Sequence, residues 1–459
     1  MKRSGSVNMN NKSLLYLGIA VGAAVFLTSC SKADGVKEKL TEKVFGINLQ
    51  DLKSSEEGEK EEDKDSSVIK LFNSKPEVDE QIRRLAEKYK EETGITVLVE
   101  SAKTGADLQA TLKAYYLSDK MPDIIACDDL VFSNLEGLLE DLSDQAWTKD
   151  TEAEYIDPVY GTLGFPYATE AIGLIYNAEI LSRAGIEASE LTTPDQVRKA
   201  FMNLDARKDQ LGLTAVVGYC AEDKNLSWST GNHIFGNYLD AGLDRSDTTY
   251  IDMINNQHTV DHDRMLKFAE FIGLLQEYSD PALLLDGTYD EQVRNFASGK
   301  YAFVTQGSWI GAVMTGADKA EYDGAGNFEV GMMPYVFDEG IDTILTSPPS
   351  WWAVLKEGNK EVSKEFLAWC AKDAGQKILV EDAGFVSPFT SCNYVAEDPF
   401  AQVVSNYIAE GKTSSWHWMN MKEGIAANAL GAVFHSYAAG EMSAESFAEE
   451  IDKAIQNYY

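Results

Sequence analysis

The pattern of apolar and polar residues from residue 68 onward predicts strands and helices in alternation. Val68–Phe72 (VIKLF) is a short apolar run typical of a buried strand. In the segment that follows, Val78, Ile82, Leu85 and Tyr89 recur at the spacing of one helix face. We therefore expect a strand followed by a helix that buries this face.

Residues with known preferences for helix ends mark the limits of this helix. Ser74 and Glu77 have the spacing of a capping box, Pro76 lies in the first turn, and Gly94 predicts the end. The chain then predicts a strand at 95–100, a helix at 107–119 and a strand at 122–127. This order implies parallel strands joined by right-handed crossovers, so we expect an α/β fold.

Polar side chains follow the first and third of these strands. Ligands of parallel α/β sheets bind beyond the carboxyl ends of the strands. The candidate ligand-binding residues there are Asn73, Ser74 and Lys75 after the first strand, and Asp128 and Asp129 after the third. The same residue types also cap helices and form turns, and the sequence leaves both roles open.

The first 30 residues have the pattern of an export signal. Basic residues precede Leu14–Leu27, an apolar run that is short for a membrane-spanning helix of about 20 residues. The segment LTSC resembles the lipobox of bacterial lipoproteins, so Cys30 would be the lipidated first residue of the mature chain. A plain signal peptide is the alternative. We expect 1–29 to be a lipoprotein signal peptide.

Residues 30–67 are predicted to be the lipidated cysteine and a flexible acidic linker. Segment 54–65 (SSEEGEKEEDKD) is nearly all charged residues, Ser and Gly. Such a segment cannot bury enough apolar surface to offset its ordering entropy. A lipid anchor followed by this linker would hold the folded part just outside the cell membrane.

Composition limits the classes of function. The chain has 459 residues, enough for two or three domains, and a formal net charge of −34. This acidic balance argues against nucleic acid, whose phosphates require a basic surface. Beyond Cys30 the cysteines are Cys127, Cys220, Cys370 and Cys392, without C-x-x-C spacing, so a zinc or redox site is unsupported. We expect small buried residues, with one or two disulfides left open.

Motifs of the common enzyme classes do not occur in the sequence. It contains no His-Glu-x-x-His, Gly-x-Ser-x-Gly, P-loop or dinucleotide-binding glycine motif. His258 and His262 are four residues apart without an obvious third ligand, which favours an exposed polar face over a metal site. We therefore expect no catalytic residues, no metal and no cofactor.

An ordered set of stretches resembles the extracellular solute-binding proteins of family 1, the sugar-binding subunits of ABC importers that include maltose-binding protein. The similarity runs from about residue 68 to the end. The stretches are LFNSKPEV (71–78), MPDIIACDD (121–129), LGFPYATEAIGLIYNAEIL (163–181), FASGKYAFVTQGSW (296–309), VGMMPYV (330–336), NKEVSKEFLAWCAKDAGQKIL (359–379) and GFVSPF (384–389).

The resemblance implies a two-lobed α/β fold with a hinge and a ligand cleft between the lobes. The chain would cross near Tyr167–Gly173, return near Pro334–Asp338 and cross again near Ser387–Cys392. Lobe one would hold 68–169 plus 336–389, and lobe two 170–335 plus 390–459, with the final helices free to pack on lobe one. Binding proteins of this kind close around their ligand.

The tryptophans suggest the ligand. Six of the eight lie in segments without a clear helix or strand pattern. A pyranose has a flat C–H face, for which an indole offers a rigid apolar surface, and nearby polar groups can fix its hydroxyls. These six residues are Trp228, Trp309, Trp351, Trp352, Trp416 and Trp418.

The resemblance assigns roles to some of these residues. It implies that Trp309 is the stacking residue of a Gly-x-Trp element, that Glu170 is the glutamate of the first crossover, and that one of Trp416 and Trp418 stacks on a sugar. Tyr167, Trp228 and Trp351 complete the expected ligand-binding set, while core packing stays open for Trp228, Trp351 and Trp352. Maltose-binding protein has a tryptophan near the position of Cys127, a departure that argues against maltose.

These observations predict a lipid-anchored, monomeric binding protein that captures an oligosaccharide and delivers it to an ABC permease in the membrane. The same fold binding a polyamine, a peptide or another small solute is one alternative, since aromatic rings also bind cations. A secreted glycan-active enzyme is another, because two carboxylates can hydrolyse a glycoside. The neutral, hydroxyl-rich and amide-rich surroundings of the tryptophans favour a sugar.

Overall fold

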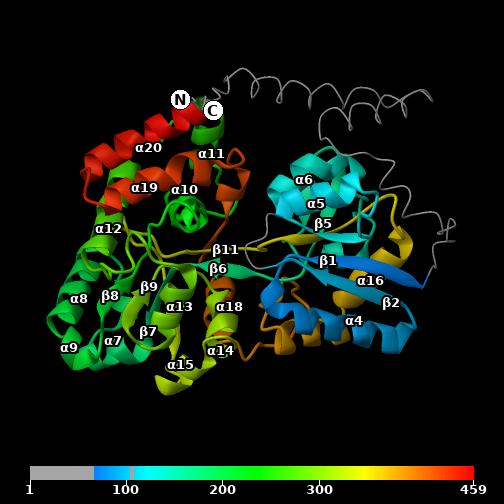
Figure 1. Ribbon diagram of the computed structural model, residues 1–459, viewed down its shortest axis with the longest axis horizontal. Coiled ribbons are helices and arrows are strands. Elements are labelled where there is room, and N and C mark those ends of the chain that lie inside the picture. The colour runs from blue at the N-terminus through cyan, green and yellow to red at the C-terminus, as the bar shows by residue number, and fades with distance from the viewer. Residues whose placement is uncertain (1–66, 104–107) are drawn as a thin grey trace, which may run out of the picture. The chain divides into compact units, whose positions relative to one another are not determined.

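Two larger sheets and one small sheet organise the part of the chain that the structure describes (Figure 1). The computed structural model describes residues 67–103 and 108–459. The expected signal peptide at 1–29, Cys30 and the linker up to residue 66 lie outside the described residues. Within the described ranges, no helix has the combination of length and hydropathy that a bilayer crossing requires.

The first sheet confirms the parallel pairing predicted for the start of the folded region. Strand β1 pairs in parallel with β2 and β3, and the sheet continues through antiparallel strands in the order β2-β1-β3-β12-β5-β4. The strands are β1 (Val68–Asn73), β2 (Thr96–Ser101), β3 (Ile124–Cys127), β4 (Tyr155–Asp157), β5 (Gly161–Pro166) and β12 (Trp351–Val354). The accompanying helices are α4 (Asp79–Thr93), α5 (Leu108–Leu117), α6 (Asp129–Leu135), α16 (Lys360–Cys370) and α17 (Asp373–Lys377).

Helix α4 buries the predicted face but begins differently from the prediction. Its buried residues include Ile82, Leu85 and Tyr89, and Gly94 ends it with a φ of 79°. The capping box of Ser74 and Glu77 does not form, because the chain enters the helix through a short 3-10 turn without a side-chain cap. The Ser74 hydroxyl lies instead 3.4 Å from that of Ser350.

The second sheet has the order β10-β7-β9-β8. Its strands are almost wholly buried, as expected for a sheet covered on both faces. They are β7 (Leu174–Asn177), β8 (Ala215–Gly218), β9 (Tyr301–Val304) and β10 (Val330–Met333). The surrounding helices are α7 (Ala178–Ala184), α8 (Pro194–Ala206), α9 (Lys208–Leu211), α12 (His262–Glu277), α13 (Tyr289–Ala297), α14 (Ile310–Thr315), α15 (Lys319–Gly324) and α18 (Ala401–Ala409).

A small sheet, called the connecting sheet below, joins segments that are far apart in sequence. It consists of β6 (Glu170–Ile172), β11 (Ile344–Ser347) and β13 (Thr413–Ser414), in the order β13-β11-β6. The chain leaves the first sheet after β5 through β6, and it returns through β11 to β12. Figure 1 shows β6 and β11 running between the two larger sheets.

The return to the first sheet is later than the resemblance implied. The expected return near Pro334–Asp338 is not observed there, because Phe337 packs edge-on against Phe268 of α12, with ring centroids 5.6 Å apart. The next passage lies between Phe389, which packs on Phe165, and Phe400, which belongs to the core of the second sheet.

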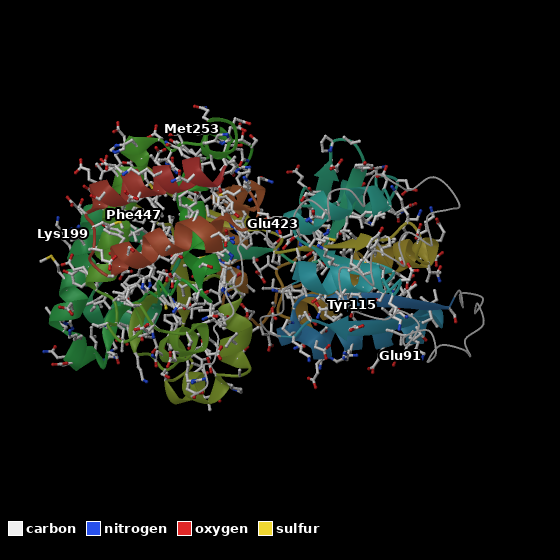
Figure 2. All side chains as sticks on the ribbon, turned by 45° about the horizontal axis from the view of Figure 1, so that its top comes forward. Glu91, Tyr115, Lys199, Met253, Glu423 and Phe447 are labelled. Carbon is white, nitrogen blue, oxygen red and sulfur yellow. The ribbon has the colours of Figure 1, made fainter. Side chains whose placement is uncertain are left out.

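The final helices pack against α12, on the side of the second sheet. Phe447 of α20 contacts Phe434 and Tyr437 of α19, and Figure 2 shows Phe447 on α20. The remaining helices are α10 (Phe235–Asp240), α11 (Thr249–Asp252), α19 (Gly431–Ala438) and α20 (Ala444–Tyr458). Short turns are η1 (Pro76–Val78), η2 (Glu136–Leu138), η3 (Ala146–Lys149), η4 (Ala188–Glu190), η5 (Ser229–Ile234), η6 (Met253–Gln257), η7 (Ile378–Asp382), η8 (His417–Asn420) and η9 (Ala426–Leu430).

The cysteines of the described residues are free thiols. Cys127, Cys220 and Cys370 are buried, as predicted, and Cys392 is partly exposed. Burial raises the pKa of the Cys370 thiol well above its usual range, so this residue behaves as a small apolar side chain.

Candidate functional site

Four indole rings surround one imidazole. The ring centroid of His233 lies 4.8 Å from that of Trp309, 5.1 Å from Trp418, 5.2 Å from Trp228 and 6.0 Å from Trp416. These five side chains are called the indole cluster below. Half of the chain's eight tryptophans therefore meet at one place, although they come from three distant segments.

Each member of the indole cluster lies at the end of a helix or in a short turn. Trp228 precedes η5, a turn of π-helical geometry that contains His233 and continues into α10. Trp309 is the residue before α14, and Trp416 and Trp418 lie at the start of η8. Because these segments lack a long repeating pattern, the sequence could not show that they meet.

Two glycines make room for the indoles. A Cβ atom at Gly307 would lie 2.1 Å from the ring of Trp309 and 2.5 Å from the carbonyl oxygen of Ala171. A Cβ atom at Gly236 of α10 would lie 2.8 Å from Cδ1 of Trp418. Real Cβ atoms do not approach this closely, so only glycine allows these rings their present positions.

A group of charged residues lies next to Trp309. The Nζ atom of Lys75 is 2.6 Å from Oε1 of Glu170 and 3.0 Å from Oε1 of Glu77. Burial opposes the charge on Lys75, but the carboxylates of Glu170 and Glu77 outweigh it and raise the pKa of Lys75 well above its ordinary value. These residues, Ser308 and Trp309 line a pocket of about 30 Å³, enough for water but not for a sugar ring.

Tyr289 connects the charged residues with the indole cluster. Its ring centroid lies 5.9 Å from that of Trp228. Burial, with the negative charge of Glu77, raises the pKa of the Tyr289 hydroxyl, which therefore stays protonated at neutral pH. The sequence analysis missed Tyr289 and His233, since a single Tyr or His in a polar stretch carries no pattern, and it also missed Ser308 and Asp398 of the pocket.

Several polar atoms of the indole cluster have no protein partner. Nδ1 of His233 and Nε1 of both Trp416 and Trp418 are buried without a hydrogen bond. Trp309 differs, because its Nε1 donates to Oε1 of Gln306 at 3.2 Å. Burial lowers the pKa of His233 to about 3, so its imidazole is neutral at physiological pH.

A buried carboxylate fixes the turn that carries Trp416 and Trp418. Oδ1 of Asp240 lies 2.5 Å from Nδ1 of His417, and Oδ2 accepts the backbone N–H of His417 at 3.0 Å. Both rings lie in the cluster, 5.8 Å apart, with Trp416 only 4% exposed and Trp418 partly exposed. Trp416 is thus packed among the other rings and Trp418 keeps an accessible part, and which of the two stacks on a sugar stays a prediction.

Trp351 and Tyr167, two of the predicted ligand-binding residues, are buried in two separate hydrophobic clusters instead. Trp351 of β12 is buried, and its Nε1 donates to the carbonyl oxygen of Ala153 at 2.6 Å. Tyr167 is buried, stacks on Trp352 at 4.7 Å and shares a 2.6 Å hydrogen bond with Ser350. The structure therefore shows core packing for Trp351, Trp352 and Tyr167 and does not bring them to the indole cluster.

The polar candidates after β1 and β3 differ in their positions. Asn73 is buried, and its side chain bonds both the N–H and the carbonyl of Lys75, so it shapes the turn that presents Lys75. Oδ1 of Asp128 accepts the N–H of Val131 at the start of α6. The side chain of Asp129 lies outside the described residues.

Metal ligation finds no support in the described part of the chain. Within residues 67–103 and 108–459, no group of three or more His, Cys, Asp or Glu side chains is arranged to hold an ion. His258 stacks instead on Tyr459, with ring centroids 4.9 Å apart.

Solved structures share the fold of this chain. RafE in complex with raffinose is 15% identical with a TM-score of 0.67, over 85% of this chain and 99% of that chain. A chitin oligosaccharide binding protein is 18% identical with a TM-score of 0.67, over 86% and 99%. A sugar transporter from Bacillus licheniformis in complex with stachyose is 17% identical with a TM-score of 0.63, over 84% and 98%.

The family of the chain follows from its sequence. Among curated proteins, none has significant sequence similarity to it. The family model of the bacterial extracellular solute-binding proteins matches residues 84–403, well over half of the chain. The two-lobed α/β fold predicted from the sequence is confirmed by the solved structures. The chain therefore belongs to the bacterial extracellular solute-binding proteins.

Proposed function

We propose that this protein captures a neutral oligosaccharide outside the cytoplasm and, as a monomer, delivers it to the permease of an ABC importer. The indole cluster carries this proposal: four indole rings and one neutral imidazole meet beside Lys75 and Glu170. Indole faces suit the C–H faces of sugars, and the charged pair beside them can bind hydroxyls. The structural neighbours carry raffinose, stachyose and chitin oligosaccharide in their names, which supports the same class of ligand.

The proposed lobes follow the sheets. Lobe one comprises 68–169 and the segment from β12 to about Phe389, and lobe two comprises the second sheet with its helices and the chain from Phe400 onward. Lys75 of lobe one pairs with Glu170 at the start of the connecting sheet. Because the pocket beside this pair is too small for a sugar ring, sugar entry requires the lobes to move apart there before they close.

A cationic solute is the second candidate. Three carboxylates, those of Glu77, Glu170 and Asp398, line the pocket together with the single cation of Lys75. Aromatic rings also attract cations. Burial raises the pKa of Asp398 to about 7, however, so this carboxyl is only partly charged at neutral pH.

A binding screen tests the two candidates directly. The melting temperature is measured with raffinose, stachyose and chitin oligosaccharides in one set, and with spermidine and mixed short peptides in another. A ligand at 100 times its Kd stabilises the native state by about 2.7 kcal/mol, so a true ligand raises the melting temperature by several degrees. If only spermidine or peptides raise the melting temperature, the sugar proposal is wrong and the ligand is a cationic solute or a peptide. If the purified protein cleaves any of these glycans, the protein is a glycan-active enzyme, and the binding-protein proposal is wrong.

A further inference from the structure

Three unpaired polar atoms gather in the indole cluster. Within the described residues, Nδ1 of His233 and the indole nitrogens of Trp416 and Trp418 are buried without a hydrogen-bond partner. Buried polar groups in proteins are nearly always paired, since an unpaired one costs about 1–3 kcal/mol. The same cluster contains three partly exposed indoles, those of Trp228, Trp309 and Trp418. Polar atoms that the protein leaves unpaired beside such faces are suited to a ligand.

The backbone around His233 holds its ring in place. Gly231 of η5 packs so closely on η9 that a Cβ atom there would lie 2.8 Å from the Cα atom of Ala426. The carbonyl oxygen of His233 accepts a 3.0 Å hydrogen bond from the side chain of Asn237 in α10. Turns of π-helical geometry occur often at functional sites. The imidazole is thus fixed at the centre of four rings by contacts that leave Nδ1 unused.

The chemistry of the unpaired atoms limits what can satisfy them. An indole N–H only donates, so Trp416 and Trp418 require acceptor atoms. A neutral imidazole nitrogen donates or accepts according to its tautomer. A hydroxyl group can do both, whereas an ammonium group only donates. The set therefore matches hydroxyl and ring oxygens and does not match a polyamine.

We propose that His233 binds the ligand directly, with Nδ1 hydrogen-bonded to a hydroxyl of a sugar ring whose neighbouring oxygens accept the N–H groups of Trp416 and Trp418. This inference rests on the proposed function and adds to it a polar centre within the indole cluster. His233 thereby makes the site selective for hydroxyl-bearing ligands over purely apolar or cationic ones.

Two substitutions of His233 separate polar contact from packing. His233→Phe keeps a ring of similar size and removes both nitrogens. His233→Asn places an amide group near the position of Nδ1 and so restores a hydrogen-bonding atom. We expect His233→Phe to weaken the best-binding sugar of raffinose, stachyose and chitin oligosaccharide by about tenfold or more, and His233→Asn to recover most of that loss. His258→Phe, at a histidine that stacks on Tyr459, is the matched control and keeps its affinity.

Nitrogen-15 spectra of the histidine rings give a readout that packing alone does not change. In the wild-type protein, the His233 Nδ1 resonance, assigned by its loss in both variants, should shift when the sugar is added. Failure of the wild-type protein to bind any of the three sugars overturns the proposed function and this inference together. If the wild-type protein binds but His233→Phe binds equally well, only the inference is overturned. An unshifted His233 resonance, with equal losses in the two variants, also overturns it.

Discussion

At the scale of single residues, the indoles of the cluster are not equivalent. Trp309 belongs both to the pocket and to the indole cluster, because it lines the pocket with Lys75 and packs on His233. Trp418 is partly exposed and leaves its indole N–H unpaired. Trp369, by contrast, packs on Tyr89 in the first lobe and donates to Glu92. The three residues therefore form a natural test set.

Replacing Trp309 or Trp418 by alanine should weaken sugar binding by about tenfold or more. Each indole offers an apolar contact of about 1.5–3 kcal/mol, and 1.4 kcal/mol corresponds to a factor of ten in Kd. Tryptophan fluorescence titration or calorimetry measures the change. Trp369→Ala is the control and should keep the wild-type affinity. Unchanged affinity in both cluster variants would exclude these rings from the binding site.

The pair of Asp240 and His417 gives stability a dependence on pH. Burial lowers the pKa of His417, but the hydrogen bond and charge of Asp240 outweigh this and raise it above its ordinary value of 6.5. Burial also raises the pKa of Asp240 above 3.8. Both groups hold protons more tightly in the folded state, so both make stability fall as pH rises. For His417 the stabilisation is complete below pH 6.5 and is lost as pH passes its folded pKa.

Variant His417→Gln should therefore lose more stability at pH 6 than at pH 9. At pH 6 the wild-type side chain is a cation hydrogen-bonded to Asp240, and hydrogen bonds to charged groups contribute about 1.5–3 kcal/mol. At pH 9 the substitution replaces a neutral imidazole by a neutral amide, so the difference in the free energy of unfolding between wild type and variant is smaller. Unfolding in urea across this pH range measures the two values. A constant difference would show that His417 does not titrate in this range.

At the scale of helices and strands, Gly236 of α10 shows how the backbone of a helix can determine the position of a ring in the indole cluster. Alanine normally stabilises a helix interior by up to about 1 kcal/mol relative to glycine. In α10 the added Cβ would instead meet Trp418 at 2.8 Å. We expect Gly236→Ala to displace this indole, to lower the free energy of unfolding by about 1–3 kcal/mol and to weaken sugar binding.

Gly324 of α15 is the control for this substitution. A Cβ atom there would have no neighbour within 4 Å, so Gly324→Ala should leave sugar affinity unchanged and stability equal or slightly higher. Thermal unfolding measures the stability of the two variants, and calorimetry measures their affinity for the sugar. Equal behaviour of Gly236→Ala and Gly324→Ala would show that Trp418 accommodates the methyl group without cost.

The sequence predicted elements well where a pattern repeats and poorly where it does not. The β1–α4–β2 unit has a clear change of period, so both strands and the end of α4 were predicted to within a residue, whereas α4 begins later than the predicted cap. Trp351 and Trp352 looked like loop residues, yet they form β12 between β3 and β5. A short central strand buried on both faces has no alternation, so its four residues carry no strand signal.

The same limit applies to the candidate site. The residues that the resemblance picked out, Trp309, Trp416, Trp418 and Glu170, do come together with Lys75 around one region. His233 could not be found from the sequence, because its importance comes from three distant segments that meet only in the folded chain. The return through β11 was also missed, since it depends on pairing with β6 rather than on local pattern.

At the scale of the whole molecule, the membrane anchor is a prediction from the sequence alone. Replacing Cys30 by serine should prevent lipidation and release the protein from the membrane fraction, because serine offers no thiol for the lipid. Fractionation of bacterial cells that express the full chain, together with intact mass, measures this. Membrane retention of the Cys30→Ser variant would point instead to an uncleaved signal segment as the anchor.

The position of β13 places two tryptophans of the indole cluster next to the connecting sheet. This strand pairs with β11 in the connecting sheet, and Trp416 follows it after a single residue. A displacement of that sheet would therefore also displace Trp416 and Trp418, which follow β13 within four residues. We therefore expect a solute that shifts the connecting sheet to change the wavelength of tryptophan emission, because the shift would change the surroundings of both indoles.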